Sequence, residues 1–240
     1  MESQNLHNFH IPVMGLAYTI DSPIRVAHLG ISSVISVMDD ELIERMNQLY
    51  SQKFELPYKE ISTKIDDFRS KRITSYLNTV DTIVKKKFIE LKTKLIENKK
   101  SVEDFLTTLP NVSHLKTELQ NYLDHNHSIN YLKNILDEHF HPGNIDVNIM
   151  TKVDREHYKG KEVLPSIYND AHAALRGFAK SSVNGSVVLS AGMNPKLFSY
   201  FEEFPCFFPS QEYKLQKQII LKVSDYRSAL IQGQQLAKKG

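Results

Sequence analysis

Residues 11–38 read IPVMGLAYTI DSPIRVAHLG ISSVISVM, and this stretch decides the fold class. Residues 11–19 are a short apolar run that predicts a buried strand, and residues 31–38 predict a second one, rich in β-branched side chains. Between them, the Asp-Ser-Pro sequence at 21–23 is typical of a helix start, and Gly30 is typical of a helix end. A strand, a capped helix and a further strand in so short a span predict a βαβ unit with parallel strands.

The range 41–142 predicts a large all-helical insertion. No glycine or proline lies between Pro57 and Pro110, and apolar residues recur there at helical spacing. Ser101 and Asp104 resemble a capping box at the start of a further helix. The helical pattern continues until Pro142-Gly143 stops it.

The alternation of strand and helix resumes after the insertion. Residues 145–153, 186–193 and 218–225 are near-continuous apolar runs, which are typical of strands covered on both faces, and a helical pattern follows each. We therefore predict an α/β protein built from parallel (βα) units of a partial TIM-type barrel. Its units are the first βα segment (1–40), the insertion (41–142) and further βα segments (143–240).

Five predicted strands are too few to close an eight-stranded barrel. Two interpretations stay open: a barrel truncated at its C-terminus, or a complete open sheet. The chain ends at Gly240, after a helix, where another strand is expected, and this favours truncation.

Composition narrows the classes of partner. The net charge of +2 gives no indication of nucleic-acid binding, and the single cysteine, Cys206, excludes an internal disulfide. The N-terminus lacks the pattern of a signal peptide, and the uncharged stretch at 11–20 is about half as long as a membrane helix. We expect a cytoplasmic protein with a small-molecule substrate and without nucleic-acid or membrane partners.

In parallel α/β folds, ligands bind at the carboxyl ends of the strands. This rule selects Lys222, Lys152 and Asp225 as candidate catalytic residues. It also selects a set of candidate cofactor-binding residues: Met14, Gly15, Ala17, Asn148, Ser190 and Gly192.

Each of these candidates also has a structural interpretation. Asp225, like Asp21 and Asn194, stands where a residue caps a helix. The two lysines follow apolar strands, so each is expected to pair with a neighbouring aspartate or to contact a ligand. That ligand contact would be to a phosphate or flavin, or the lysine would be an amine that forms a Schiff base. Gly192 fits either a bulge or the close approach of a flat ring to the backbone.

The histidines and Cys206 give weaker indications of a functional site than these candidates. His125 with His127, and His139 with His141, form two H-x-H pairs, but residues two apart on a helix point in different directions and cannot grip one metal. Cys206 lies in an aromatic turn, where we expect packing and not catalysis. We therefore predict no metal site.

The opening segment resembles a known family. Ile11-Pro12-Val13-Met14-Gly15, with the Asp-Ser-Pro sequence at 21–23 and Gly30-Ile31, is similar to the first βα unit of flavin-dependent TIM barrels such as nitronate monooxygenases and the synthase domain of glutamate synthase. The closing LKVSD at 221–225 looks like a later unit of those barrels, in which a strand lysine approaches the flavin. The chain also looks like the N-terminal part of a longer bacterial family.

The resemblance implies an FMN cofactor. Met14 and Gly15 would be neighbours of the flavin ring, and Lys222 a polar partner of the flavin or the substrate. The phosphate-binding loops of that family lie in barrel strands that this chain lacks, and the helical insertion is not typical of it.

Three hypotheses of function follow. The first is an FMN-dependent oxidoreductase-like barrel. The second is a Schiff-base lyase with Lys222 or Lys152 as nucleophile and Asp225 or Asp154 as proton shuttle. The third is a non-catalytic α/β scaffold that binds a protein partner through the helical insertion.

Overall fold

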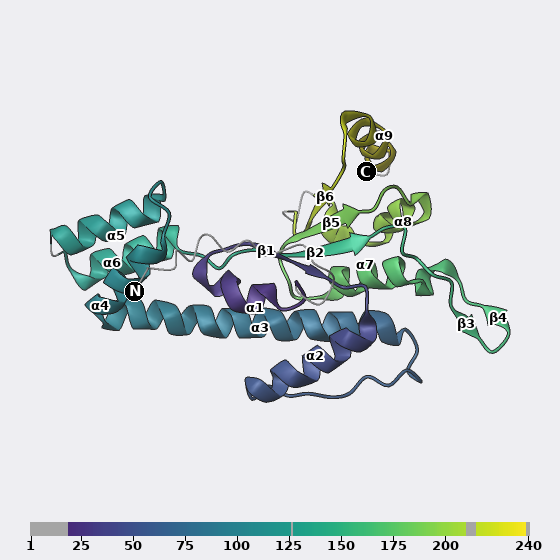
Figure 1. The fold of residues 1–240 in the computed structure, drawn as a ribbon, viewed down its shortest axis with the longest axis horizontal. Helices are drawn as coiled ribbons and strands as arrows, with labels where there is room; N and C mark the ends of the chain where they lie inside the picture. Colours follow the sequence, from purple (N-terminus) through teal and green to yellow (C-terminus); the bar gives the residue numbers. More distant parts are fainter. Residues whose placement is uncertain (1–18, 126, 210–214, 239–240) are drawn as a thin grey trace, which may run out of the picture.

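A parallel sheet is the centre of the molecule (Figure 1). The computed structural model describes residues 19–125, 127–209 and 215–238. Its four-stranded sheet has the order β1-β2-β5-β6, and all neighbouring strands are parallel. These strands are β1 (Ser33–Ser36), β2 (Ile145–Met150), β5 (Ser186–Ser190) and β6 (Gln218–Leu221). Four of the five predicted strands are thus confirmed, whereas residues 11–18 of the other lie outside the described residues.

Helices occupy the predicted segments between the strands, so the chain is a mixed α/β protein. They are α1 (Ser22–Val26), α2 (Asp40–Lys53), α3 (Phe68–Glu97), α4 (Lys99–Thr108), α5 (His114–Asp124), α6 (Ile129–His139), α7 (Asp170–Lys180), α8 (Pro195–Tyr200) and α9 (Tyr226–Ala237). An antiparallel hairpin of β3 (Tyr158–Lys159) and β4 (Glu162–Val163), which the sequence did not predict, stands between β2 and α7.

The two faces of the sheet differ. Ile35, Val147 and Val187 are neighbours in register and fully buried, in one core with residues of α3 and α7. The next residues along each strand point to the opposite face, where Asn148 is half-buried and Ile220 is 43% exposed. The expectation that the strands are covered on both faces is therefore not met, because burial alternates along β2 as it does in a one-sided sheet.

Helix α3 connects two hydrophobic cores. Its 30 residues span about 45 Å at the rise of an α-helix. Tyr76, Leu77 and Val80 belong to the main core with the sheet, whereas Leu95 belongs to a second core with α4, α5 and α6. Figure 1 shows these three helices gathered at one end of α3. The range 41–142 contains no strand among its described residues, and it contributes to both cores.

Helices α3 and α7 approach each other closely at Gly177. A Cβ atom added there would lie 2.7 Å from Cγ2 of Ile73, which is shorter than a van der Waals contact. Only glycine therefore allows the two backbones to pack at this distance. The contact fixes α7 between α3 and the sheet.

The predicted helix starts fared differently. Asn194 and Asp225 cap α8 and α9 as predicted, since each side chain accepts a hydrogen bond from a backbone N–H of the first turn. Asp39, for which no cap was predicted, caps α2 in the same way. Asp21 precedes α1 but makes no such bond; its carboxylate accepts from the Tyr50 hydroxyl at 2.6 Å instead.

The capping box predicted at Ser101 and Asp104 is wrong. Helix α4 starts earlier, with Asn98 as its cap, whose side chain accepts a hydrogen bond from the Lys100 N–H. An asparagine is as good a cap as a serine, and it lies closer to the end of α3.

Candidate functional site

Three strands end together at one edge of the sheet. Met150 is in register with Ser190, and the Lys222 N–H donates to the Leu189 carbonyl at 2.9 Å, which aligns the ends of β2, β5 and β6. Because the strands are parallel, the loops that follow them converge at this edge.

The loops enclose an open cleft of about 590 Å³. Its walls come from the ends of β2, β5 and β6 and from the first two turns of α9. Met150, Lys152, Ser190, Ala191, Gly192, Lys222, Val223, Ser224, Ser228 and Gln232 line it. Four of the residues selected from the sequence, namely Lys152, Ser190, Gly192 and Lys222, thus lie in one cleft.

Two of the candidates lie beside the cleft and three lie outside the described residues. Asn148 is on the same face of the sheet as Ser190 but further from the edge, and its amide donates to the Ser36 hydroxyl at 3.3 Å. The Asp225 carboxylate accepts from the Ser228 N–H at 2.8 Å, where it caps α9. Met14, Gly15 and Ala17 belong to residues 1–18, which the structure does not describe.

Lys152 and Lys222 are both exposed, and their amines have no hydrogen-bond or ion-pair partner among the described residues. Of the two expected roles, pairing with a neighbouring aspartate is not found among the described residues, and contact with a ligand stays a prediction. Asp154 and Asp225 bind other groups, and the lysines need no anionic partner because water reaches them. Two cations that no described carboxylate neutralises give the cleft a positive charge.

Gly192 provides the room for Lys152. Its φ of +98° lies in the left-handed region, and a Cβ atom there would be 2.6 Å from Cε of Lys152. The preceding residue, Ala191, also has a positive φ of 65°, which is uncommon for alanine. The lysine side chain therefore lies directly against the backbone that ends β5.

A hydrogen-bond network holds the loops after β2 and β5 together. The Thr151 hydroxyl donates to the Ser190 carbonyl at 2.9 Å and also contacts the carbonyl of Gly192. The Asn194 amide donates to the Thr151 carbonyl at 2.9 Å and to Asp154 Oδ2 at 3.1 Å. These bonds fix the positions of Lys152 and Gly192 relative to each other.

Asp154 is the centre of this network. Its Oδ1 accepts the Ala171 N–H at 2.9 Å in the first turn of α7, and its Oδ2 lies 2.9 Å from Nδ1 of the buried His172. Burial alone would raise the pKa of Asp154, but the close contact and charge of His172, with the amide of Asn194, lower it below its usual value. Asp154 is thus a structural anion.

Sequence reasoning missed Thr151 and His172. Thr151 is one residue past β2 and fully buried, and His172 is inside an apolar helix pattern. The one available signal was a polar residue at a position that the helical period places in the core. Among the described residues, no group of three or more His, Cys, Asp or Glu side chains is arranged to hold a metal ion.

Comparisons of the chain with family models, with curated proteins and with solved structures gave no match. Within the described part of the chain, no helix combines the length and the apolar content that crossing a bilayer requires.

Proposed function

We propose that the chain forms part of an FMN-dependent oxidoreductase-like barrel, in which the cleft at the carboxyl edge binds the flavin or its anionic substrate. One observation carries the proposal: Lys152 and Lys222 reach the same cleft from different strands, and no carboxylate among the described residues neutralises either amine.

The order of the strands supports a partial barrel. In β1-β2-β5-β6, each new strand along the chain is added in parallel to the same edge of the sheet. A (β/α) barrel grows in this way, and its ligands bind at the carboxyl ends of its strands, where the cleft lies.

The residues of the cleft fit a flavin in two respects. Ala191, at the end of β5, carries only a methyl group, so a flat ring can approach the backbone there. Reduced flavin carries negative charge on its ring, and a lysine beside that charge stabilises it. When bound, FMN would supply the hydride chemistry, while Lys152 and Lys222 would hold its anionic groups or those of the substrate.

The N-terminus of α9 borders the cleft, but its backbone N–H groups contribute little to the binding of an anion. Asp225 already accepts the Ser228 N–H, and its carboxylate also accepts from the hydroxyls of Ser224 and Ser228. The first turn of α9 is therefore satisfied by a negative group of the chain itself, and an anionic ligand would depend on the two lysines. The same bonds occupy Asp225, and the His172 pair occupies Asp154, so neither carboxylate is free for the proton transfer of a Schiff-base lyase.

Titration of the purified chain with FMN, followed by quenching of flavin fluorescence, tests the proposal. Replacing Lys152 and Lys222 together by alanine should weaken binding about a hundredfold or more, since each of the two lost charged hydrogen bonds contributes about 1.5–3 kcal/mol. Lys196→Ala, which removes an exposed lysine of α8 outside the cleft, is the matched control.

Stability should change by no more than about 0.5 kcal/mol in all these variants, because the side chains are exposed. Wild-type chain that leaves FMN fluorescence unchanged, or a double variant that binds FMN as tightly as the wild type, would overturn the proposal.

A further inference from the structure

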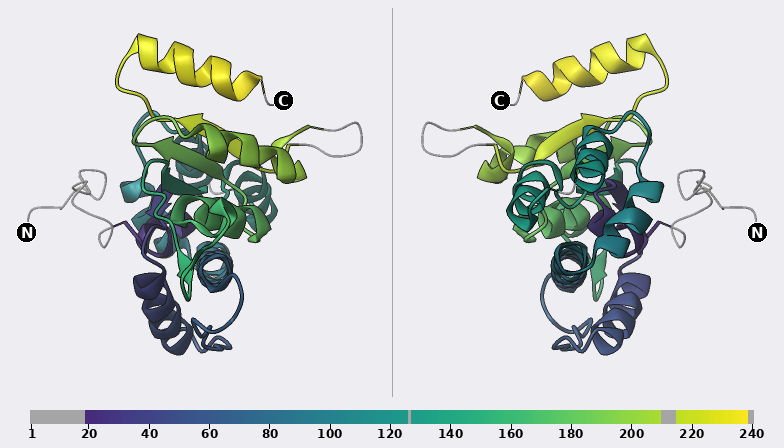
Figure 2. Two further views of the ribbon diagram at one scale, coloured as in Figure 1. Left: turned by 90° about the vertical axis from the view of Figure 1, so that its right-hand side faces the viewer. Right: turned by 90° about the vertical axis from the view of Figure 1, so that its left-hand side faces the viewer.

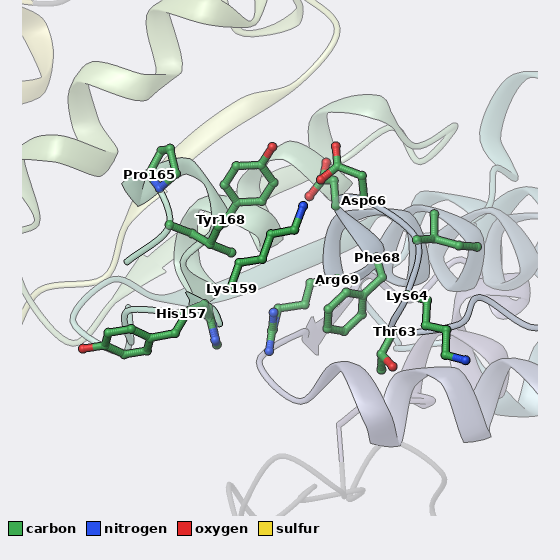
Figure 3. Close-up of a pocket in the computed structure, with 13 residues that line it drawn as sticks. Thr63, Lys64, Asp66, Phe68, Arg69, His157, Lys159, Pro165 and Tyr168 are labelled. Carbon is green, nitrogen blue, oxygen red and sulfur yellow. The ribbon is translucent and has the colours of Figure 1, made fainter. Parts of the chain in front are cut away.

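The loop that follows β2 also lines a second pocket. This pocket has a volume of about 730 Å³ and opens between the loop that leads into α3 and the β3–β4 hairpin (Figure 3). Thr63, Lys64, Ile65, Asp66, Asp67, Phe68, Arg69, His157, Tyr158, Lys159, Leu164, Pro165 and Tyr168 line it. Its size is typical of pockets for small organic molecules.

Positive charge predominates in this pocket once the internal ion pairs are counted. Both carboxylate oxygens of Asp67 accept hydrogen bonds from the guanidinium of Arg176. Arg176 does not line the pocket, and it neutralises the charge of Asp67 from outside it. His157 Nε2 lies 2.7 Å from the buried Asp170. Arg69 forms ion pairs with Asp40 and Asp170, so Lys64 and Lys159 then face a single uncompensated carboxylate of the lining, that of Asp66.

Arg69 is held in place without a full set of partners. Its side chain is 24% exposed, and its Nε lies 3.5 Å from Asp40 and 3.6 Å from Asp170, both longer than a hydrogen bond. Its guanidinium carbon is 4.5 Å from the centre of the Phe68 ring, which fixes its orientation. Among the described residues it makes no hydrogen bond, so its terminal N–H groups are available to a ligand.

The pocket walls are fixed before any ligand binds. Asp170 accepts from Arg155 Nε at 2.7 Å and contacts His157, which ties the base of the hairpin to the start of α7. The Leu164 N–H donates to the His157 carbonyl at 2.7 Å and closes the hairpin. Such preorganisation lowers the entropy cost of binding.

Aromatic and apolar side chains complete the lining. Figure 3 shows Lys159 extending from the hairpin toward Asp66, with Tyr168 on one side and Arg69 and Phe68 on the other. Flat hydrophobic walls beside a guanidinium suit a ligand that combines a ring with an anion. Several cations favour the double charge of a phosphate over the single charge of a carboxylate.

We infer that this pocket binds a small organic phosphate that carries a planar ring, with Arg69 and Lys159 as the ligands of the phosphate group. The site is separate from the cleft of Lys152 and Lys222, and it does not depend on the function proposed for that cleft.

Isothermal titration calorimetry with 5′-AMP as the probe tests this inference. AMP should bind the wild-type chain, whereas adenosine, inorganic phosphate and benzoate should each bind at least about tenfold more weakly, because each lacks the phosphate, the ring or the second charge. Arg69→Ala and Lys159→Ala should each weaken AMP binding about tenfold or more.

The control variant is Lys161→Ala, which removes an exposed lysine of the same hairpin that does not line the pocket. Lys159 is exposed and has no partner among the described residues, so its replacement leaves the fold intact even if that of Arg69 does not. Absence of AMP binding to the wild type, equal binding of adenosine or benzoate, or an unchanged affinity in Lys159→Ala would overturn the inference.

Variants of each site show whether a ligand binds in the pocket or in the cleft. Replacement of Lys152 and Lys222 should leave AMP affinity unchanged, and loss of AMP binding in that variant would also contradict the inference. FMN binding that is lost in Lys159→Ala but kept in the Lys152 and Lys222 double variant would support a phosphate site here and overturn the placement of the flavin in the cleft.

Discussion

Helices α7 and α9 start at the same edge of the sheet but are held very differently. Every residue of α7 from Asp170 to Phe178 is buried, whereas Gln232 is the single buried residue of α9. Figure 2 shows α9 at the opposite end of the molecule from α2 and α3. At the start of α7 the charges bind one another, while near α9 two lysines have no partner in the part of the chain that the structure describes. The paired charges stabilise the start of α7, whereas the unpaired lysines belong to the cleft that we propose as a binding site.

The largest effect is expected from the residue that anchors α7. Asp154→Ala removes two bonds to the first turn of α7 and leaves His172 buried without its partner. We expect the free energy of unfolding to fall by about 3 kcal/mol, measured by urea denaturation. Asp225→Ala, at the corresponding position before the exposed α9, should lower it much less. Equal losses in the two variants would remove the distinction between the helices.

Replacing the glycines inside α7 and α9 should change the stability of the protein by smaller amounts and in opposite directions. Gly177→Ala forces a methyl group against Ile73 and should destabilise the protein by about 1–2 kcal/mol. No atom lies within 4 Å of a Cβ placed at Gly233, so Gly233→Ala should stabilise it by about 0.5–1 kcal/mol through helix propensity. Thermal melting of both variants tests this. Destabilisation by Gly233→Ala would show that other atoms pack against α9 at this position.

The pH dependence of stability gives the smallest effect. The pKa of Asp154 is lower in the folded protein than its usual value of 3.8, so the unfolded chain binds the proton more readily. The stabilisation by this carboxylate is therefore complete above that value and is lost as the pH falls through the lowered pKa. Asp154→Asn should flatten the decline of stability in this acid range. An unchanged slope would assign the decline to other carboxylates.

Much of the fold could be predicted from the sequence because its signals are local. Apolar runs gave the strands β1, β2, β5 and β6, and Asn194 followed by Pro195 marked the start of α8. The hairpin β3–β4 was missed because its strands have two exposed residues each, so the sequence shows no alternation of apolar and polar residues there. The half-exposed second face was missed because the composition of a short strand does not reveal what covers it.

The candidate site was predictable only in part. The rule that ligands bind at carboxyl ends selected Lys152, Ser190, Gly192 and Lys222, and the structure brings these four residues to one cleft. It could not show that Asp154 pairs with His172, since that depends on where the loop after β2 meets α7. The pocket at Arg69 was not predicted either, because Arg69 and Lys159 come together only through tertiary contacts between two loops.

The length of α3 has a consequence for how the protein melts. One continuous helix supplies Leu77 to the core under the sheet and Leu95 to the core of α4, α5 and α6. Neither core can come apart without exposing apolar side chains of a helix that the other also holds. Calorimetry should therefore record one cooperative unfolding transition. Deletion of residues 41–142 would remove part of the core that packs against the sheet as well as the helices of the second core.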